Sequence, residues 1–233
     1  LNPNNTFNPQ TEALLNAIRE KSTEDPLIGA KIGAKEVYQR LIDAFKTEKG
    51  VHIESILCAL GALAGYSCQA SLRTQALLQG IDGDSMFVVM GTADGKKYFY
   101  GDALNALVAE SQYSVWGLAG GAAQKIGCTS LPDLNEIFKH TTESLGNDKF
   151  GILRIPLNHK PSDTPINYLK NLWPALIPTV QLFCPNPSDW PILFGLAIQE
   201  AIYAGKAVIE PVIAITIIME SAIFMSKVDL DKS

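Results

Sequence analysis

The feature that most constrains the fold is a run of small residues inside a long stretch of helical character, residues 51–78. Eight consecutive positions, residues 58–65, hold only Cys, Ala, Leu and Gly, with Gly61 and Gly65 one helical turn apart. A glycine inside a helix costs about 1 kcal/mol relative to alanine. Two glycines at this spacing indicate that another helix approaches closely. Internal packing is the favoured interpretation, and a dimer contact or a ligand close to the backbone are the alternatives.

The C-terminal part of the chain is strongly apolar. The uncharged apolar run at residues 211–219 is much shorter than the ~20 residues of a membrane-spanning helix, and Glu200, Lys206, Glu210 and Glu220 interrupt the rest, so no membrane span is predicted. The last helix is expected to start near Lys206, with Pro211 in its first turn. Only Thr216, Glu220 and Lys227 form a polar stripe on it. A helix that is apolar nearly all round is buried in a core or in a subunit interface.

One β-hairpin is predicted over residues 86–100. Two runs rich in β-branched and aromatic residues, 87–90 and 98–100, flank Asp94-Gly95, and Asp-Gly favours a two-residue type I′ turn. Further strands are predicted near 150–157 and 179–183. The remaining segments have helical periodicity. The expected fold class is therefore α+β, mainly helical, with a small antiparallel sheet built on the hairpin.

The domain organisation is predicted to be one globular domain over residues 1–233, with residues 1–7 as a flexible arm. No signal peptide is visible at the N-terminus, because the polar first residues lack a basic segment followed by an apolar one. Thr164-Pro165 is expected to open a short helix that stops before Pro174, because the residue before a proline disfavours helical backbone angles.

The net charge and the spacing of the cysteines exclude some classes of protein. The formal net charge is −5 and no run of basic residues occurs, which argues against nucleic acid as a partner. Charged residues make up 18% of the chain, below the usual ~25%, which favours extensive burial or a subunit interface. The four cysteines contain no C-x-x-C pair, so a zinc ribbon is excluded and buried thiols in a reducing, cytoplasmic location are expected.

The common catalytic motifs are missing. Residues 91–97 are rich in glycine and lysine, but the spacing does not fit a P-loop and a strand follows. His52 and Glu54 match the H-x-E half of the zinc deaminase signature, but the P-C-x-x-C half is absent. One metal ligand is too few for a metal site. No metal or cofactor is therefore predicted, and His52 and Glu54 are expected to lie in the first turn of a helix.

Several carboxylates in apolar surroundings are the best candidates for a ligand pocket. Glu200, Glu210 and Glu220 all occur in or beside apolar helical segments. A carboxylate buried without a partner costs several kcal/mol or takes up a proton, so each needs water, a cation, donors or a ligand. With His52 and Glu54 they form the set of pocket candidates, and their catalytic role stays open.

Three functional hypotheses follow, and one of them is a membrane-associated protein that uses its apolar C-terminal segment. The favoured one is a non-catalytic cytoplasmic binding or interaction module that self-associates as a homodimer through its apolar C-terminal helices, with a small molecule as a possible ligand. The alternative is an enzyme of the hydrolase or lyase type that uses carboxylates in a polar pocket. The sequence alone does not decide whether the chain is an enzyme.

Overall fold

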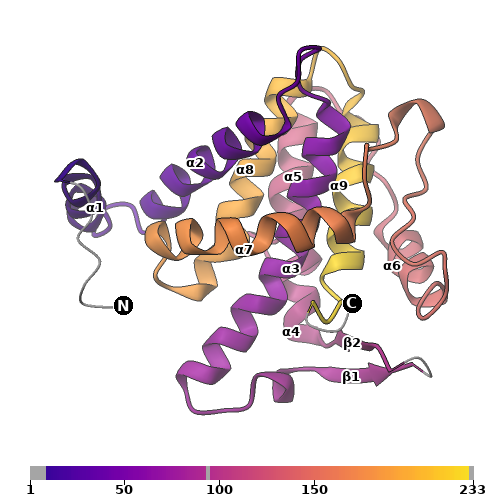
Figure 1. Cartoon of the computed structure of the whole chain (residues 1–233), viewed down its shortest axis with the longest axis horizontal. Helices are drawn as coiled ribbons and strands as arrows, with labels where there is room; N and C mark the ends of the chain where they lie inside the picture. Colours follow the sequence, from indigo (N-terminus) through magenta and orange to yellow (C-terminus); the bar gives the residue numbers. More distant parts are fainter. Residues whose placement is uncertain (1–8, 93–94, 231–233) are drawn as a thin grey trace.

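A computed structural model describes residues 9–92 and 95–230, and it places one long helix, α3 (Ile53–Leu78), at the centre of a helical bundle. The helices that pack most extensively on α3 are α9 (Pro211–Met225), α8 (Trp190–Gly205) and α7 (Pro165–Phe183) (Figure 1). The predicted arm, residues 1–7, falls outside the described residues.

The small-residue run of α3 lies directly against α9. A methyl group on Gly61 would lie 2.5 Å from the carbonyl oxygen of Ile218, and one on Gly65 would overlap the carbonyl of Ala222. The two backbones therefore touch, and the prediction of internal helix packing is confirmed. The sequence left open whether the last helix is buried in a core or in a subunit interface. In the structure α9 is buried within one chain from Ile217 to its last residue, Met225.

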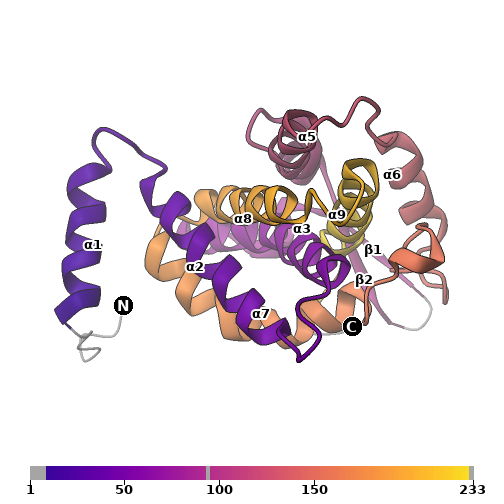
Figure 2. The same cartoon turned by 90° about the horizontal axis from the view of Figure 1, so that it is seen from above.

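The outer helices complete the bundle. Helix α8 lies between α2 (Ile28–Phe45) and α5 (Val115–Lys125) and packs against both. Glycines again permit the contacts, since a methyl group on Gly33 would lie 2.6 Å from the Leu193 side chain. Helix α6 (Leu134–Glu143) rests on α9, and the short α4 (Asp102–Asn105) continues into one π-helical turn, Ala106–Glu110. Helix α1 (Pro9–Lys21) stands apart from the bundle beside α2 (Figure 2).

The hairpin consists of β1 (Val88–Gly91) and β2 (Lys97–Tyr100), paired antiparallel with Val89 opposite Phe99. The last pair is closed by the N–H of Thr92, which donates to the carbonyl of Lys96. Three residues therefore lie between the paired positions instead of two. Gly95 has a φ of +83°, which suits the left-handed position of a three-residue hairpin loop. Asp94, on which the two-residue turn was predicted, lies outside the described residues.

The fold class is confirmed as mainly helical α+β, with a small two-stranded antiparallel sheet among the described residues. The two additional strands are wrong. Residues 150–156 form a turn and irregular chain that leads into a 3₁₀ turn at Leu157, and the N–H of Arg154 donates to the side chain of Glu220 instead of to a neighbouring strand. Residues 179–183 are the last turn and a half of α7. β-branched residues favour a strand only weakly, and the packing of α7 against the core outweighs this preference.

The prediction that the helix opened by Pro165 stops before Pro174 is also wrong. Helix α7 runs to Phe183 and contains both Pro174 and Pro178. The two prolines lie one turn apart on the solvent-exposed side, where the carbonyls that lose their partners can bind water. The opposite side buries an apolar stripe that packs into the core: Leu169, Trp173, Leu176 and Val180.

The last helix begins at Pro211, not near Lys206 as expected. Gly205 ends α8, a turn follows, and Pro211 takes the first helical position, where its missing N–H costs nothing. Helix α3 is long and apolar enough to cross a membrane by length and composition, and 89% of that stretch is buried inside the protein. A buried core helix can have the same length and apolar composition, so these two properties alone are weak evidence for a membrane span.

We predict that Gly65→Ala destabilises the protein by about 3 kcal/mol, because the added methyl group meets the backbone of α9, which cannot move aside. Gly121→Ala is the matched control. Gly121 lies in the exposed middle of α5 with no atom near the added methyl group, so the substitution should stabilise by about 0.5–1 kcal/mol. Urea unfolding of both variants measures the difference, and equal effects would contradict the close contact.

Candidate functional site

Glu54 lies at the centre of a polar cluster at the N-terminus of α3. Its side chain is 10% exposed, and its two oxygens contact two histidines. Oε1 lies 2.9 Å from Nδ1 of His159, and Oε2 lies 3.2 Å from Nε2 of His52. The structure therefore brings together the predicted residues His52 and Glu54, and adds His159 from the short 3₁₀ turn Leu157–His159.

Ser55 extends this cluster. Its Oγ lies 2.8 Å from Nδ1 of His52, so Ser55, His52 and Glu54 follow one another in the order of a catalytic triad. The hydroxyl of Ser55 is buried, however, and accepts the backbone N–H of Ser162 at 3.0 Å. A nucleophile must be open to its substrate, and this hydroxyl is enclosed. The cluster instead fastens the loop of residues 157–163 to the start of α3.

Glu220 is buried in α9 and is held by Arg154. Its side chain is 2% exposed, its Oε1 accepts Nε–H of Arg154 at 3.0 Å, and its Oε2 accepts the backbone N–H of the same residue. The guanidinium also donates to the carbonyl of Glu136. Glu220 thus has a charged partner and two donors, which removes the need for a ligand.

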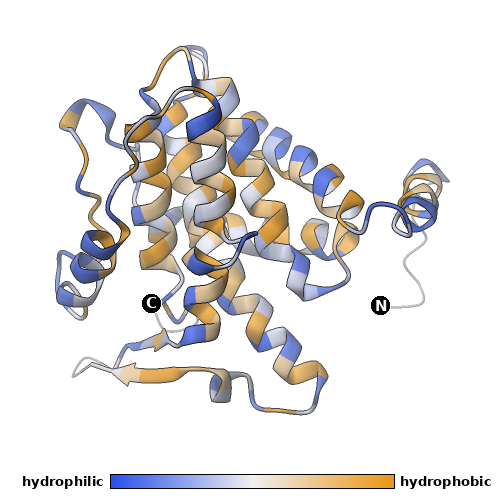
Figure 3. Ribbon diagram, turned by 180° about the vertical axis from the view of Figure 1, so that it is seen from behind, coloured by the Kyte–Doolittle hydropathy of each residue, from blue (hydrophilic) through white to orange (hydrophobic). Residues whose placement is uncertain are grey.

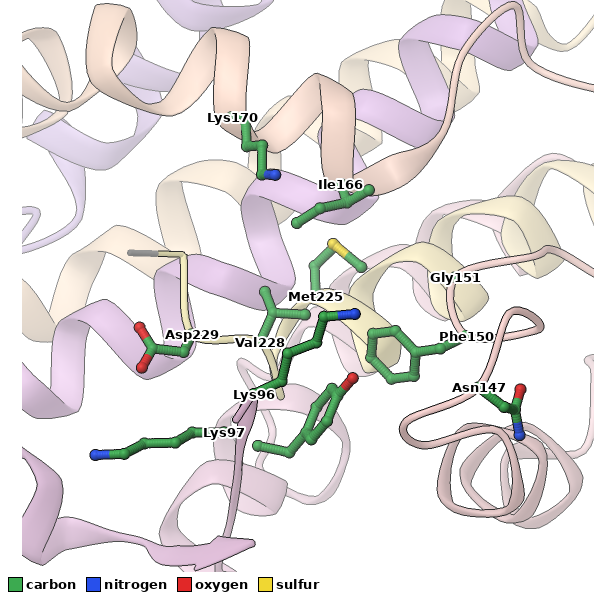
Figure 4. Close-up of a pocket in the computed structure, with 11 residues that line it drawn as sticks. Lys96, Lys97, Asn147, Phe150, Gly151, Ile166, Lys170, Met225, Val228 and Asp229 are labelled. Atoms are coloured by element: carbon green, nitrogen blue, oxygen red, sulfur yellow. The ribbon is translucent and has the colours of Figure 1, made fainter. Parts of the chain in front are cut away.

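The other two predicted carboxylates lie elsewhere. Glu200 is half-buried on α8, and together with burial its charge raises the pKa of Tyr38. Glu210 is exposed at the position before α9. None of the four glutamates lines the hollow of about 210 Å³ between the start of β2 and α7 (Figure 4), and none lines a smaller hollow beside Arg154. Among the described residues, no group of three or more His, Cys, Asp or Glu side chains could hold a metal ion.

Lys227 is a buried cation that lies just after α9, which ends at Met225, and not on the polar stripe of the last helix as its sequence position predicted. The residue is 1% exposed, and its Nζ donates to Oδ1 of Asn105 at 3.2 Å. The ammonium group lies over the ring of Tyr100 at 4.8 Å and that of Phe138 at 5.7 Å. No carboxylate of the described residues is within ion-pair distance of it. Burial lowers the pKa of Lys227 to about 8.

The second unusual feature is a group of exposed apolar side chains at the end of α3 and on β1, where the chain leaves the bundle (Figure 3): Leu77, Leu78, Ile81, Met86, Val88, Val89 and Met90. All four residues of β1 are exposed. Val88, Val89 and Met90 are 64%, 40% and 46% exposed, which is unusual for side chains of this kind. Single exposed apolar residues are common, whereas three consecutive ones on a strand are unusual and are typical of interaction surfaces.

The strand β1 is also open along one edge. Because Thr92 bonds to Lys96, the alternation of an antiparallel ladder turns the N–H and C=O groups of Val88 and Met90 toward β2. The corresponding groups of Val89 and Gly91 point away from β2. The far edge of β2 is covered, since the N–H of Phe99 donates to the carbonyl of Lys227. The sheet therefore ends in one covered and one open edge.

Comparison with known proteins gives no relative: no protein-family model, no curated protein and no solved structure matches the chain.

We predict that Arg154→Ala destabilises the protein by about 2 kcal/mol, because it removes the charged partner of a buried carboxylate. The value is reduced from that of a fully buried pair because Arg154 is 41% exposed. Adding Glu220→Gln should recover part of the loss. The control is Arg40→Ala, whose exposed ion pair with Glu36 should contribute no more than about 0.5 kcal/mol. Equal losses at Arg154 and Arg40 in urea unfolding would contradict this account.

We predict that Lys227→Met stabilises the protein at pH 7 and that the gain disappears at high pH. The folded state lowers the pKa of this base, so the unfolded state binds more protons between about pH 8 and the ordinary lysine value of 10.5. The cost of the buried charge is complete below pH 8 and is lost as the pH rises through this window. The expected difference between pH 7 and pH 10.5 is roughly 3 kcal/mol. A difference that stays constant over this range in urea unfolding would show that the lysine is not the cause.

Proposed function

We propose that the protein is a non-catalytic interaction module that self-associates, and that two copies pair through the open edge of β1. The observation that carries the proposal is the exposure of every residue of β1 on an unpaired edge. An exposed, apolar edge strand is a ready template for another strand. The surface differs from the one expected from the sequence, because α9 is buried within one chain.

The chemistry of β1 favours a second copy of the same strand as the partner. Residues 85–92 contain no charged residue, so antiparallel self-pairing places no like charges opposite each other. A twofold axis through Val89 sets the register, because the backbone groups of Val89 point outward. Val88 of one copy then lies opposite Met90 of the other, and two exposed apolar side chains cover each other.

The backbone of the paired strands is well matched in this register. The N–H and C=O of Val89 exchange two hydrogen bonds across the axis, as in a hydrogen-bonded antiparallel pair. The N–H of Gly91 reaches the carbonyl of Phe87 on the other copy, and the reverse bond forms by symmetry. The N–H of Phe87 is already bonded to Asp84, so the two hairpins become a four-stranded sheet joined by four hydrogen bonds.

The arrangement of the acidic and thiol groups supports a non-catalytic, cytoplasmic protein. The carboxylates proposed for acid–base chemistry lie in separate places: Glu220 is held by Arg154 and Glu54 by two histidines. Glu200 is half-buried on α8, and Glu210 is exposed before α9. The four cysteines are free thiols. Burial raises the pKa of three of them, Cys58, Cys68 and Cys184, to about 12, which makes them unreactive as nucleophiles. Free, unreactive thiols fit a reducing compartment.

We predict that Val89→Pro abolishes dimer formation and leaves the fold intact. Proline removes an N–H that points away from β2, which an edge strand tolerates, and its ring blocks the incoming strand. Light scattering over a concentration series should give twice the 25.2 kDa of one chain for the wild type and the single-chain mass for the variant. Circular dichroism of both proteins checks the fold.

Two further variants separate edge pairing from general stickiness. Val88→Lys places a charge in the apolar contact and should also give a monomer. Val208→Lys changes an equally exposed valine, 69% exposed in the turn between α8 and α9, and should remain dimeric. A wild-type chain that stays at 25.2 kDa throughout, or a Val89→Pro variant that dimerises as tightly as the wild type, overturns the proposal.

A further inference from the structure

The four methionines of the chain divide into a buried pair and an exposed pair. Met219 and Met225 lie in α9 and are completely buried. Met90 lies in β1 and is 46% exposed, and Met86, at the end of the 3₁₀ turn that precedes β1, is 37% exposed. A dissolved oxidant reaches exposed thioethers far more readily than those in a packed core, so only the pair beside and on the open edge is open to modification.

The position of Met90 connects this exposure with self-association. In the proposed pairing of two β1 strands, on which the following inference rests, Met90 of each copy lies opposite Val88 of the other. This pair is of the type without hydrogen bonds between its two residues, in which the side chains approach most closely. The twofold axis repeats the contact, so the pairing places two thioethers against two valines. Met86 lies outside the paired residues, in the 3₁₀ turn.

We infer that Met90 is a modification site through which a peroxide controls the self-association of the protein. Hydrogen peroxide transfers one oxygen atom to the thioether sulfur: its O–O bond breaks, an S–O bond forms, and the other oxygen leaves as water. The sulfur loses two electrons and the peroxide gains them. A methionine sulfoxide reductase reverses the change with two thiols, which become a disulfide while the oxygen leaves as water.

Oxidation opposes the pairing because it places a polar group in an apolar contact. The sulfoxide oxygen is a hydrogen-bond acceptor, and the valine side chain opposite it has no donor. Covering this oxygen removes its water without replacing the hydrogen bond. Each oxidised Met90 should therefore weaken the dimer about tenfold, and the two in a fully oxidised dimer about a hundredfold.

The pairing should in turn protect Met90 from the oxidant. The incoming strand covers the Met90 side chain, whereas Met86 stays open in both states. Met90 should therefore react more slowly as the protein concentration rises and the dimer forms, while the rate at Met86 stays constant. In the Val89→Pro variant, which cannot pair, neither rate should depend on concentration. Met86 is thus an internal reference within the same chain.

The experiment uses the Cys128→Ser chain, because Cys128 is the one of the four thiols that is only partly buried and could also react. The chain is treated with hydrogen peroxide over a concentration series. Mass spectrometry of its peptides should find one added oxygen at Met86 and at Met90, and none at Met219 or Met225. Light scattering should show the weaker dimer, and methionine sulfoxide reductase with dithiothreitol should restore it.

Two matched variants assign the effect to one side chain. Met90→Leu keeps the apolar contact without a thioether, so it should dimerise and stay insensitive to peroxide. Met86→Leu should dissociate on oxidation as the parent chain does. Equal sensitivity of the two variants, or an unchanged dissociation constant once Met90 is oxidised, overturns the inference and leaves the strand pairing standing. A chain that is monomeric before any oxidation instead overturns the pairing, and the inference with it.

Discussion

The contact between the backbones of α3 and α9 is the constraint on which the rest of the structure depends. At Gly61 and Gly65, α3 has no side chain between its backbone and that of α9, so the two helices approach more closely than larger residues would allow. This position leaves α9 without a face toward water over most of its length, which explains why its sequence is apolar nearly all round. Because Glu220 of α9 is buried as well, its carboxylate needs a partner inside the protein. Arg154, from the loop between α6 and α7, is that partner.

The same contact positions the hairpin. Further along α3, the side-chain amide of Gln69 donates to the carbonyls of Ser226 and Val228 and fixes the chain just after α9. The segment fixed in this way accepts the N–H of Phe99 at the carbonyl of Lys227. A two-stranded hairpin is marginally stable by itself, so β2 depends on this third segment of chain for its order. The buried position of Lys227 follows from this arrangement, because its backbone serves the sheet.

Local chemistry predicted the parts of the fold that neighbouring residues determine. Turn residues flanked by apolar runs were sufficient to predict the hairpin. Two glycines one helical turn apart were sufficient to predict the close contact between helices. The strand expected at 150–157 fails for a reason that no local pattern contains: the N–H of Arg154 is satisfied by a side chain 66 residues away. The same difference between local and distant residues applies to the polar cluster around Glu54. His52 and Glu54 are two positions apart and were found together, whereas His159, which is 105 residues from Glu54, gave no signal.

The charges of the hairpin lie beside or on only one of its two strands. Natural edge strands are commonly protected by lysine, proline or a bulge, and β1 contains none of these residues among its four. The lysines of the hairpin lie elsewhere: Lys96 just before β2 and Lys97 at its first position. The far edge of β2 is already covered, because the N–H of Phe99 donates to the carbonyl of Lys227. The uncharged strand is therefore the one with the open edge, which is the arrangement that the proposed strand pairing requires, because a lysine on β1 would face its own copy or lose its water.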